Sequence, residues 1–544
     1  MNKIYTTDMS RSAEEVSAGY SSVAELFREA VKKNGDKVMF ECFGTSMTYD
    51  EVDEAADSFA AWLQQDLGVV KGDRIALMCP NVFAFPIAMH GIIRAGGCQV
   101  NVNPLYTPRE MAHQLNDSGA ETIVIFGGST PVLAEVLAET PVKNVVTVDL
   151  ADGTDLSIPS PAVDTRLKNY TRFADALKKG QSLPFEPVRL TGDDLLFLQY
   201  TGGTTGPSKG ATLSHSNLVA NTAQFKSSLA EACVEGEEVL VLALPLYHIF
   251  GLMVMLTYST IGARMVLIPN PRDMDGFIDA IKDAGLTVLP GVNTMFQGLS
   301  AHSRIKEVDL SNYKLAVGGG AAVIEDTSNR WKALTGHHIK EAYGMSETSP
   351  AVSLTPVHEP TFTGTCGKLC AGTEVRLLDD DGNDVPLGEA GELAIRGPQV
   401  MSGYWQKDEA NAKSFTPDGF FLTGDVAVIS ENGYIKIVDR KKDMVIVSGF
   451  NVYPNEIEAT VTACDGVAEC ACIGVPDAKS GEALRVYAVK EAGADLTAEQ
   501  VTNHCRNELT GYKVPRQIVF VDELPKSNVG KILRRELRDM ALKS

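Results

Sequence analysis

The segment Leu195–Ala211, LLFLQYTGGTTGPSKGA, combines residue types that bind a polyphosphate. An apolar run that reads as a buried strand ends at Tyr200 and passes into a loop of glycine, threonine and serine. Glycines let backbone N–H groups approach an anion, hydroxyls add donors, and Lys209 adds a positive charge. The candidate binding residues of this loop are Thr201, Gly202, Gly203, Thr204, Thr205, Gly206, Ser208 and Lys209.

The loop differs from the common phosphate loop, in which Gly-Lys is followed by Ser or Thr. Here Lys209 follows Ser208 and precedes Gly210, which points away from the usual ATPases and toward another nucleotide chemistry. The alternative is a flexible Gly/Ser-rich linker. A linker rarely begins directly at a buried strand, and further motifs downstream argue against it.

Two apolar segments further along the chain contain residues that could contact a ligand. In LPLYHIFGL, Tyr247 and His248 interrupt the apolar run, although a histidine there is more often a satisfied core residue than a ligand. In VGGGAAV, three glycines at a predicted strand end would let the backbone approach a flat ligand, and the alternative is a tight turn. These glycines are Gly318, Gly319 and Gly320.

The segment EAYGMSET offers groups for a nucleotide base and for a metal ion. Tyr343 supplies an aromatic face, and Glu347 supplies a hard oxygen ligand for Mg²⁺. Gly344 and Ser346, which lie between Tyr343 and Glu347 in the sequence, are the other candidate binding residues of this segment. Taken alone, the segment could be a helix start with a capping serine.

Two segments near the C-terminus add charged candidates. Asp425 and Arg440 flank a hairpin-like stretch; a carboxylate suits the two hydroxyls of a ribose, and a guanidinium adds donors. Lys531 follows Gly530 in the loop of PKSNVGKILRREL, before a basic helix. Alone, these residues could be surface charges or an ion pair.

The composition limits the classes of partner and location. The net charge of −21 argues against nucleic acid as a partner but leaves room for a local nucleotide pocket. The first twenty residues lack the apolar core of a secretory peptide, and Ile249–Ile268 is too interrupted for a transmembrane helix. The spacing of the cysteines does not match a zinc site, so reduced thiols and a cytoplasmic location are expected.

The chain of 544 residues should contain more than one domain, and alternating helix and strand patterns predict an α/β fold. We expect a large N-terminal domain of layered α/β subdomains with a small β-rich, barrel-like subdomain, then a small mobile α+β domain. Residues 152–187 read as a loosely structured connection, and 364–439 as hairpins or a small barrel. The predicted domains are residues 1–439 and 440–544.

In their order and spacing, YTGGTTGPSKGA, YGMSE, TGD, DRKKD and PKSNVGKILRREL closely resemble the adenylate-forming superfamily. This superfamily includes acyl-CoA synthetases, peptide-synthetase adenylation domains and luciferases. LPLYHIFGL, NVNPLYTPRE and VDRKKDMVIVSGFNVYPNEIE look most like bacterial long-chain fatty acid–CoA ligases. The resemblance covers nearly the whole chain.

The resemblance implies a role for each candidate residue. It makes Lys531, Glu347 and His248 catalytic, with Glu347 holding Mg²⁺ and His248 near the acyl carboxylate. The remaining assignments are these: Thr201–Lys209 for the β- and γ-phosphates, Tyr343 and Gly318–Gly320 for adenine, Asp425 and Arg440 for ribose, Gly449 for the pantetheine channel, and Lys442 as the hinge of the C-terminal domain.

The implied activity is that of an acid–thiol ligase, which converts a long-chain fatty acid to its CoA thioester through an acyl-adenylate. It would use ATP, Mg²⁺ and coenzyme A, with small molecules and no nucleic acid as partners. A homodimer and peripheral membrane contact are open. Alternatives are a ligase for medium-chain or aryl acids, transfer to a carrier protein, and a silent lipid-binding protein, which would lack Lys531, Glu347 or Asp425.

Overall fold

The computed structural model describes residues 5–6, 19–201, 207–448, 450–477, 479–526 and 532–543. The chain divides into two compact units. Among the described residues, the N-terminal unit covers Thr6, 19–374 and 396–415, and the C-terminal unit covers Tyr5, 375–395 and 416–543. This division does not follow the expected boundary at residue 440, because the β-rich segment before it packs with the segment after it. The mobile domain 440–544 stays a prediction.

One sheet of the N-terminal unit contains the strand that leads into the candidate phosphate loop. Its strands are short and largely buried, as is usual for parallel strands covered by helices on both faces. Neighbouring strands of this sheet run parallel, except that β9 and β10 pair antiparallel. The order across the sheet is β10 (Lys209–Ser214), β9 (Leu195–Thr201), β5 (Cys98–Asn101), β4 (Arg74–Met78), β6 (Thr122–Phe126), β7 (Asn144–Val148) and β8 (Thr171–Arg172).

A second sheet of this unit contains the strands that precede the glycine run and the YGMSE segment. Its central strands are parallel, and antiparallel strands lie at both edges. The order across the sheet is β17 (Lys368–Leu369), β16 (Ala351–Leu354), β15 (Ile339–Gly344), β14 (Leu315–Gly318), β13 (Val288–Gly291), β11 (Val239–Leu242), β12 (Arg264–Leu267), β2 (Val38–Cys42) and β3 (Thr45–Thr48).

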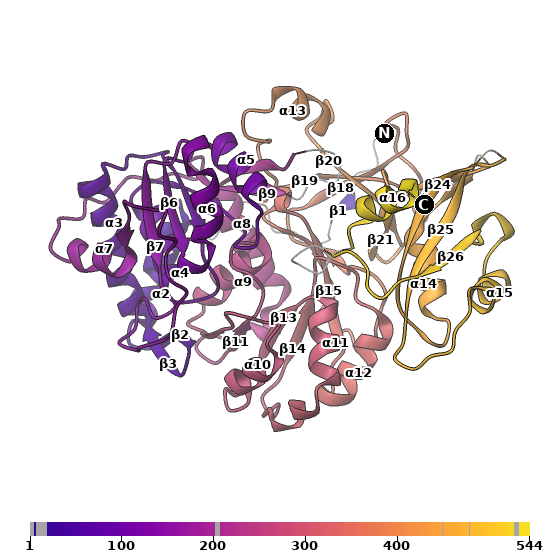
Figure 1. Cartoon of the computed structure of the whole chain (residues 1–544), viewed down its shortest axis with the longest axis horizontal. Coiled ribbons are helices and arrows are strands. Elements are labelled where there is room, and N and C mark those ends of the chain that lie inside the picture. The colour runs from indigo at the N-terminus through magenta and orange to yellow at the C-terminus, as the bar shows by residue number, and fades with distance from the viewer. Residues whose placement is uncertain are drawn as a thin grey trace. The chain divides into compact units, whose positions relative to one another are not determined.

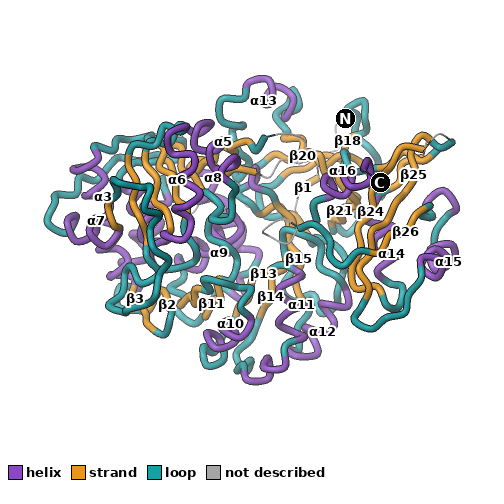
Figure 2. The backbone as a smooth tube through the Cα atoms, in the orientation of Figure 1, coloured by secondary structure: helices purple, strands orange, loops and turns teal. Residues whose placement is uncertain are grey.

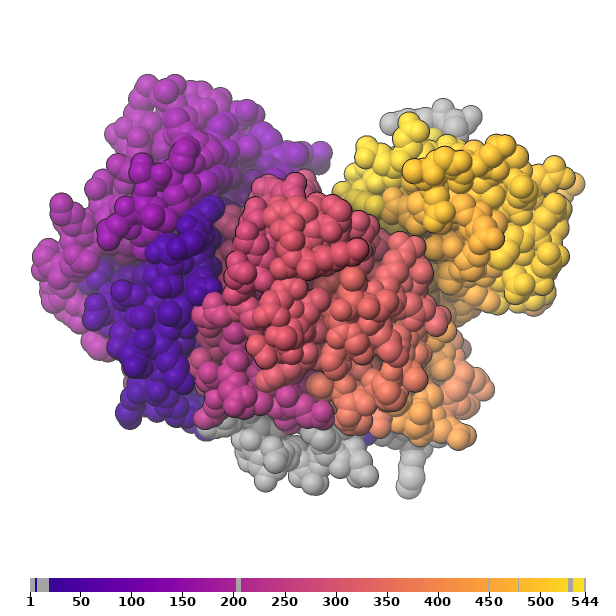
Figure 3. All heavy atoms as spheres, turned by 90° about the horizontal axis from the view of Figure 1, so that it is seen from below, coloured from indigo at the N-terminus to yellow at the C-terminus, as the bar shows by residue number. Residues whose placement is uncertain are grey.

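The pairing of β12 with β2 joins segments that are more than 200 residues apart in the chain. Figure 3 shows the result at the surface, where the indigo N-terminal segment lies against the magenta segment. The N-terminal unit is therefore built from interleaved parts of the sequence.

Helices connect the parallel strands and cover the sheets (Figures 1 and 2). The longest of these, Tyr49–Leu67, begins with a capping box between Thr48 and Glu51 and ends at Gly68 in the left-handed conformation. The helices are α2 (Val23–Asn34), α3 (Tyr49–Leu67), α4 (Ala84–Arg94), α5 (Pro108–Ser118), α6 (Thr130–Val136), α7 (Phe173–Gly180), α8 (His215–Ser228), α9 (Ile249–Ser259), α10 (Met274–Ile281), α11 (Asn293–Ala301), α12 (Glu325–Thr335) and α13 (Asp408–Ser414).

The expectation of a loosely structured connection over residues 152–187 is wrong in its C-terminal half. This part contains β8 and α7, and α7 lies beside α3 in Figure 1. Phe173 and Ala176 are fully buried, and the Phe173 ring lies 4.8 Å from that of Phe59. The short apolar face of α7 forms because it packs on α3, and the polar composition of the segment conceals it.

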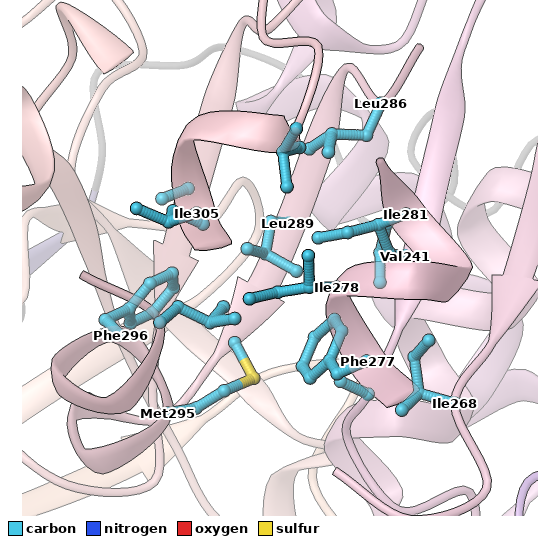
Figure 4. Packing of buried hydrophobic residues seen from close by; sticks show 14 of the residues in the cluster. Val241, Ile268, Phe277, Ile278, Ile281, Leu286, Leu289, Met295, Phe296 and Ile305 are labelled. Atoms are coloured by element: carbon cyan, nitrogen blue, oxygen red, sulfur yellow. The ribbon is translucent and has the colours of Figure 1, made fainter. Parts of the chain in front are cut away.

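A hydrophobic cluster between the second sheet and its helices contains side chains of β11, β13, α10 and α11 (Figure 4). Phe277, Leu289 and Phe296 are almost completely buried in it. Burial of side chains of this size stabilises the fold by about 1.5–3 kcal/mol each. The cluster therefore fixes the sheet whose strand ends carry the glycine run and the YGMSE segment.

The β-rich segment of the C-terminal unit forms an antiparallel sheet. Turns at Asp381-Gly382 and Asn432-Gly433, whose glycines have φ of 81° and 80°, confirm the hairpins expected in residues 364–439. The order across the sheet is β1 (Tyr5–Thr6), β18 (Glu374–Leu378), β19 (Gly391–Arg396), β20 (Phe421–Ile429) and β21 (Ile435–Arg440).

The last segment of the chain forms an α+β layer structure, as predicted. Alternate residues of its strands point to opposite faces: Cys470 and Cys472 pack with α14 and α15, and Ala471 and Ile473 pack with α16. Both faces are apolar because both are covered. The elements are β22 (Val445–Val447), β23 (Phe450–Val452), β24 (Val467–Asp477), β25 (Gly481–Lys490), β26 (Gln517–Phe520), α14 (Pro454–Thr462), α15 (Ala498–Glu508) and α16 (Arg534–Lys543).

No helix within the described part of the chain is both long enough and apolar enough to cross a membrane.

The LPLYH segment after β11 is fixed by one buried side chain, Asn81. Its Nδ2 donates to the carbonyl oxygens of Leu242 and Leu244, both at 2.9 Å, and its Oδ1 accepts from Leu246 N at 2.9 Å. Asn81 is only 4% exposed, so water cannot replace these bonds.

We expect Asn81→Ala to lower the free energy of unfolding by about 2–4 kcal/mol, because it leaves buried backbone groups unpaired. Chemical denaturation monitored by circular dichroism measures this change. Asn116→Ala is the matched control, because Asn116 also donates to two carbonyl oxygens but is exposed to water. Equal losses in the two variants would contradict the importance of burial.

Candidate active site

The strands on either side of the candidate phosphate loop, β9 and β10, pair antiparallel with each other. Lys209 lies opposite Thr201 in the register of β9 and β10. His113 on α5 contacts the carbonyl oxygen of Ser208 through Nε2 at 2.8 Å, which fixes the returning strand. Gly202, Gly203, Thr204, Thr205 and Gly206 lie outside the described residues.

The YGMSE segment forms the end of β15 and a tight turn. Gly344 must be glycine, because a Cβ there would lie 2.1 Å from the carbonyl oxygen of Pro350. Buried Asn221 of α8 bonds both the N–H and the carbonyl of Ala351, at 2.9 and 2.8 Å, and so holds the turn's exit. The turn carries Ser346 and Glu347, and Glu347 is 6% exposed. The alternative of a helix start with a capping serine is wrong, because Ser346–Thr348 is a single 3₁₀ turn with Met345 at its N-cap, and a strand follows.

The segment 401–405 joins this turn to the loop strand. Met401 N donates to the carbonyl oxygen of Glu347 at 2.8 Å, and Trp405 N donates to that of Gly210 at 2.8 Å. Between them, the Tyr404 hydroxyl donates to Glu347 Oε1 at 2.8 Å. The Lys209 ammonium lies 4.8 Å from the centre of the Tyr404 ring. Lys209 and Glu347, which were predicted from different motifs, thus both contact the side chain of Tyr404.

Tyr404 is a neutral hydrogen-bond donor at physiological pH. Burial raises the pKa of its hydroxyl, and the adjacent Glu347 carboxylate raises this pKa further. A protonated phenol next to a carboxylate donates, so one oxygen of Glu347 has a fixed partner and the carboxylate has a fixed orientation.

The glycine run lies at the end of β14, against α9. A Cβ at Gly319 would lie 2.9 Å from the ring of Phe250, and a Cβ at Gly318 would lie 2.5 Å from Val323. Gly320 has φ of 77°, in the left-handed region. The glycine run therefore packs closely against neighbouring side chains and also forms a turn. Both the close approach of the backbone and the tight turn considered from the sequence are present.

His248 precedes α9, and its backbone position is set by a chain of buried amides. Asn101 donates to Gln199 at 2.9 Å, and Gln199 donates to the carbonyl oxygen of Tyr247 at 3.1 Å. Burial raises the pKa of the Tyr247 hydroxyl to about 12. The strand before the phosphate loop is thus tied to the peptide bond between Tyr247 and His248.

Asp425 and Arg440 lie opposite each other on β20 and β21 of the C-terminal unit. Arg440 Nε is 3.3 Å from Asp425 Oδ1, and Asp425 is 4% exposed. The ion pair considered from the sequence is therefore present. A cavity of about 290 Å³ adjoins this pair and is lined by Thr423, Gly424, Arg440, Lys441 and Lys442.

The predicted hinge residue Lys442 lies between two charged contacts to the last segment. Before it, Asp439 accepts from Asn455 N at 2.8 Å; after it, Asp443 contacts Arg538 at 2.6 Å. Burial lowers the pKa of Lys442, and the positive charge of Arg440 lowers it further. Gly449 and Lys531 lie outside the described residues.

Glu347 supplies one carboxylate that fits a magnesium ion. Among the described residues, no group of three or more His, Cys, Asp or Glu side chains could hold a metal ion. Mg²⁺ needs no such group, because it is commonly held by one or two carboxylates together with substrate phosphates and water. Glu347 matches that requirement, because its carboxylate contacts Tyr404, whose ring also lies near the ammonium of Lys209.

Comparison with known proteins identifies the family. Residues 27–405 match the model described as AMP-binding enzyme, and residues 456–531 match the AMP-binding enzyme C-terminal domain. The chain belongs to the AMP-binding enzyme family. This confirms the resemblance to adenylate-forming enzymes that the motifs predicted.

Individual relatives align over nearly the whole chain. A long-chain-fatty-acid–CoA ligase of Yersinia pestis is 46% identical over 536 residues, which cover 96% of this chain and 95% of the relative. The ligase of that name from Haemophilus influenzae is 42% identical and covers 99% and 98%. The crystal structure of ATP-bound MatB from Rhodopseudomonas palustris aligns with a TM-score of 0.84 at 31% identity, covering 95% and 98%. The predicted α/β fold class is confirmed.

Several residues that build the site were not predicted from the sequence. Tyr404 lies in a Gly-Tyr-Trp run without a helix or strand pattern around it. Only its contacts in the folded structure indicate that it belongs to the candidate site. Gln199 does leave a signal, since it is an amide within the apolar strand LLFLQYT. A buried polar residue in such a strand requires a partner, which here is the carbonyl of Tyr247.

We expect Gly344→Ala to weaken AMP binding by about tenfold or more, because displacing a positioning turn by an ångström can cost orders of magnitude. Isothermal titration calorimetry measures the affinity. Gly298→Ala is the matched control, since within 4 Å its Cβ would meet only the end of the flexible Met274 side chain, with the methyl carbon at 2.8 Å and the sulfur at 3.6 Å. Unchanged AMP affinity in a folded Gly344→Ala variant would contradict this interpretation of the turn.

Proposed function

We propose that this protein activates long-chain fatty acids with ATP and transfers the acyl group to coenzyme A, releasing AMP and pyrophosphate. The observation that carries the proposal is 46% identity to a long-chain-fatty-acid–CoA ligase over 96% of the chain. The convergence of Lys209 and Glu347 on Tyr404 supports it, because nucleotide activation needs a cation and a metal ligand side by side.

In the first half-reaction, a carboxylate oxygen of the fatty acid attacks the α-phosphorus of ATP, and the bond to pyrophosphate breaks. The product is a mixed anhydride, the acyl-adenylate. This step is needed because a carboxylate is a poor electrophile whose leaving group would be oxide. The adenylate replaces that leaving group with AMP.

The residues of the N-terminal unit would bind and orient the nucleotide. Thr201, Ser208 and Lys209 would contact the β- and γ-phosphates, while Tyr343 and the glycine run Gly318–Gly320 would flank adenine. Glu347 would hold Mg²⁺, which screens the charge of the departing pyrophosphate when bound. His248, at the start of α9, would lie near the acyl carboxylate.

The C-terminal unit would supply the ribose contacts and one cation. Asp425 would accept hydrogen bonds from the ribose hydroxyls, and its ion pair with Arg440 orients its carboxylate. Lys531 would stabilise the charge that develops between the α-phosphate and the attacking carboxylate, a task for a preorganised cation.

In the second half-reaction, the thiol of coenzyme A gives its proton to water, its sulfur attacks the acyl carbon, and the bond from that carbon to the phosphate oxygen breaks, which releases AMP and leaves the thioester. Lys531 has no part in this step. A rotation of residues 440–544 about Lys442 would remove it, and the loop at Gly449 would then line the pantetheine channel. The contact between Asp439 and Asn455 spans Lys442, so such a rotation must break it.

The same proposal places the enzyme in the cytoplasm. Homodimer formation and peripheral contact with a membrane, which a lipophilic substrate favours, are tested by light scattering and by sedimentation with vesicles.

The direct test is AMP release from ATP and Mg²⁺ with a panel of acids from hexanoate to octadecanoate, with and without coenzyme A. We expect turnover that requires coenzyme A and is fastest from dodecanoate to octadecanoate. Activity confined to short or aromatic acids would overturn the substrate class. Pyrophosphate release that stops at one equivalent despite coenzyme A would indicate transfer to another acceptor.

We expect Lys531→Ala to slow adenylate formation by about 100-fold or more, while supplied acyl-adenylate is still converted to thioester. Pyrophosphate exchange measures the first half-reaction, and thioester formation from synthetic adenylate measures the second. Lys526→Ala is the control, because Lys526 pairs with Glu469 at 2.6 Å and has no assigned role in the site. Equal loss of both half-reactions would argue against two separate conformations.

A further inference from the structure

Tyr404 contacts both Glu347, the proposed ligand of Mg²⁺, and Lys209, the proposed contact of the ATP phosphates. Its hydroxyl donates to Glu347 at 2.8 Å, and its ring lies 4.8 Å from the ammonium of Lys209. These two contacts use different parts of one side chain, so they can be removed separately. A side chain that only filled space would not need both.

The backbone of Tyr404 is held as firmly as its side chain. Tyr404 forms a β-bridge with Ala211, and Gly403 O accepts from both Thr212 N, at 2.9 Å, and the Thr212 hydroxyl, at 2.6 Å. Asn411 Oδ1 accepts from Tyr404 N at 2.7 Å. The segment therefore moves with β10, which is the strand that carries Lys209.

We infer that Tyr404 is a positioning residue that couples the metal ligand to the phosphate loop. The hydroxyl orients the Glu347 carboxylate for Mg²⁺, and the ring faces the ammonium of Lys209. The coupling makes the effect of Mg²⁺ on ATP binding depend on one hydroxyl. This inference rests on the proposed function, in which Glu347 holds Mg²⁺ and Lys209 contacts phosphate.

Two substitutions separate the two contacts. Tyr404→Phe keeps the ring over Lys209 and removes the hydroxyl, while Tyr404→Leu removes both. Tyr49→Phe is the matched control, because the buried Tyr49 hydroxyl also donates to an oxygen, Ala263 O at 2.9 Å, far from the site in sequence and role.

The experiment titrates ATP into the enzyme by calorimetry, once with Mg²⁺ and once with EDTA, without fatty acid. The ratio of the two affinities is the enhancement by Mg²⁺. We expect Tyr404→Phe to reduce this ratio by about 10- to 100-fold, the usual cost of removing a partner that orients a metal ligand. Its affinity for ATP in EDTA should equal that of the wild type.

Tyr404→Leu should lose the enhancement in the same way and also bind ATP in EDTA about two- to fivefold more weakly, because Lys209 loses its aromatic contact. In a Glu347→Gln background, Tyr404→Phe should have no further effect on the ratio. Tyr49→Phe should leave the ratio unchanged.

The outcomes distinguish this inference from the function on which it rests. If Tyr404→Phe keeps the wild-type ratio, or loses affinity equally with Mg²⁺ and EDTA, Tyr404 does not act through Glu347 and the inference is overturned. If wild-type enzyme forms no acyl-adenylate with any acid, the proposed function fails instead.

Discussion

The hydrogen bond from Tyr404 to Glu347 connects the two sheets of the N-terminal unit at the candidate site. It links a turn at the end of β15 to a strand of the other sheet, β10, through the segment 401–405. The two sheets fold around separate cores, so contacts between them must set the distance from Glu347 to Lys209. The segment 401–405, which bonds to both sheets, supplies several of these contacts, and the bonds of Asn221 to Ala351 supply others.

Buried polar side chains act as fixed spacers elsewhere in the same unit. Asn81 holds LPLYH, Asn221 holds the exit of the YGMSE turn, and Gln199 ties the loop strand to Tyr247. An unpaired amide inside a protein costs free energy, so each of these side chains has essentially one stable arrangement. The candidate loops are therefore held in place where they leave the sheets.

The C-terminal unit distributes its charges differently. Asp425 and Arg440 neutralise each other across two antiparallel strands, whereas Asp439 and Asp443 bond to residues of the last segment. The first pair can stay intact during a rotation about Lys442, but the contact of Asp439 with Asn455 cannot. Close to the predicted hinge, the C-terminal unit thus has an ion pair, Asp425 with Arg440, that a rotation would preserve, and a hydrogen bond, Asn455 to Asp439, that a rotation would break.

The sequence by itself determined the family, the α/β class and most elements, because short apolar strands, capping boxes and turn residues act locally. It also singled out Lys209, Tyr343, Glu347, Asp425 and Arg440 as candidate site residues, because their residue types suit nucleotide chemistry. The tertiary structure alone revealed α7, the grouping of 375–440 with the C-terminal segment, and Tyr404. These depend on contacts between residues distant in the chain: α7 is apolar only where it meets α3, and Tyr404 matters only because Glu347 and Lys209 lie on either side of it.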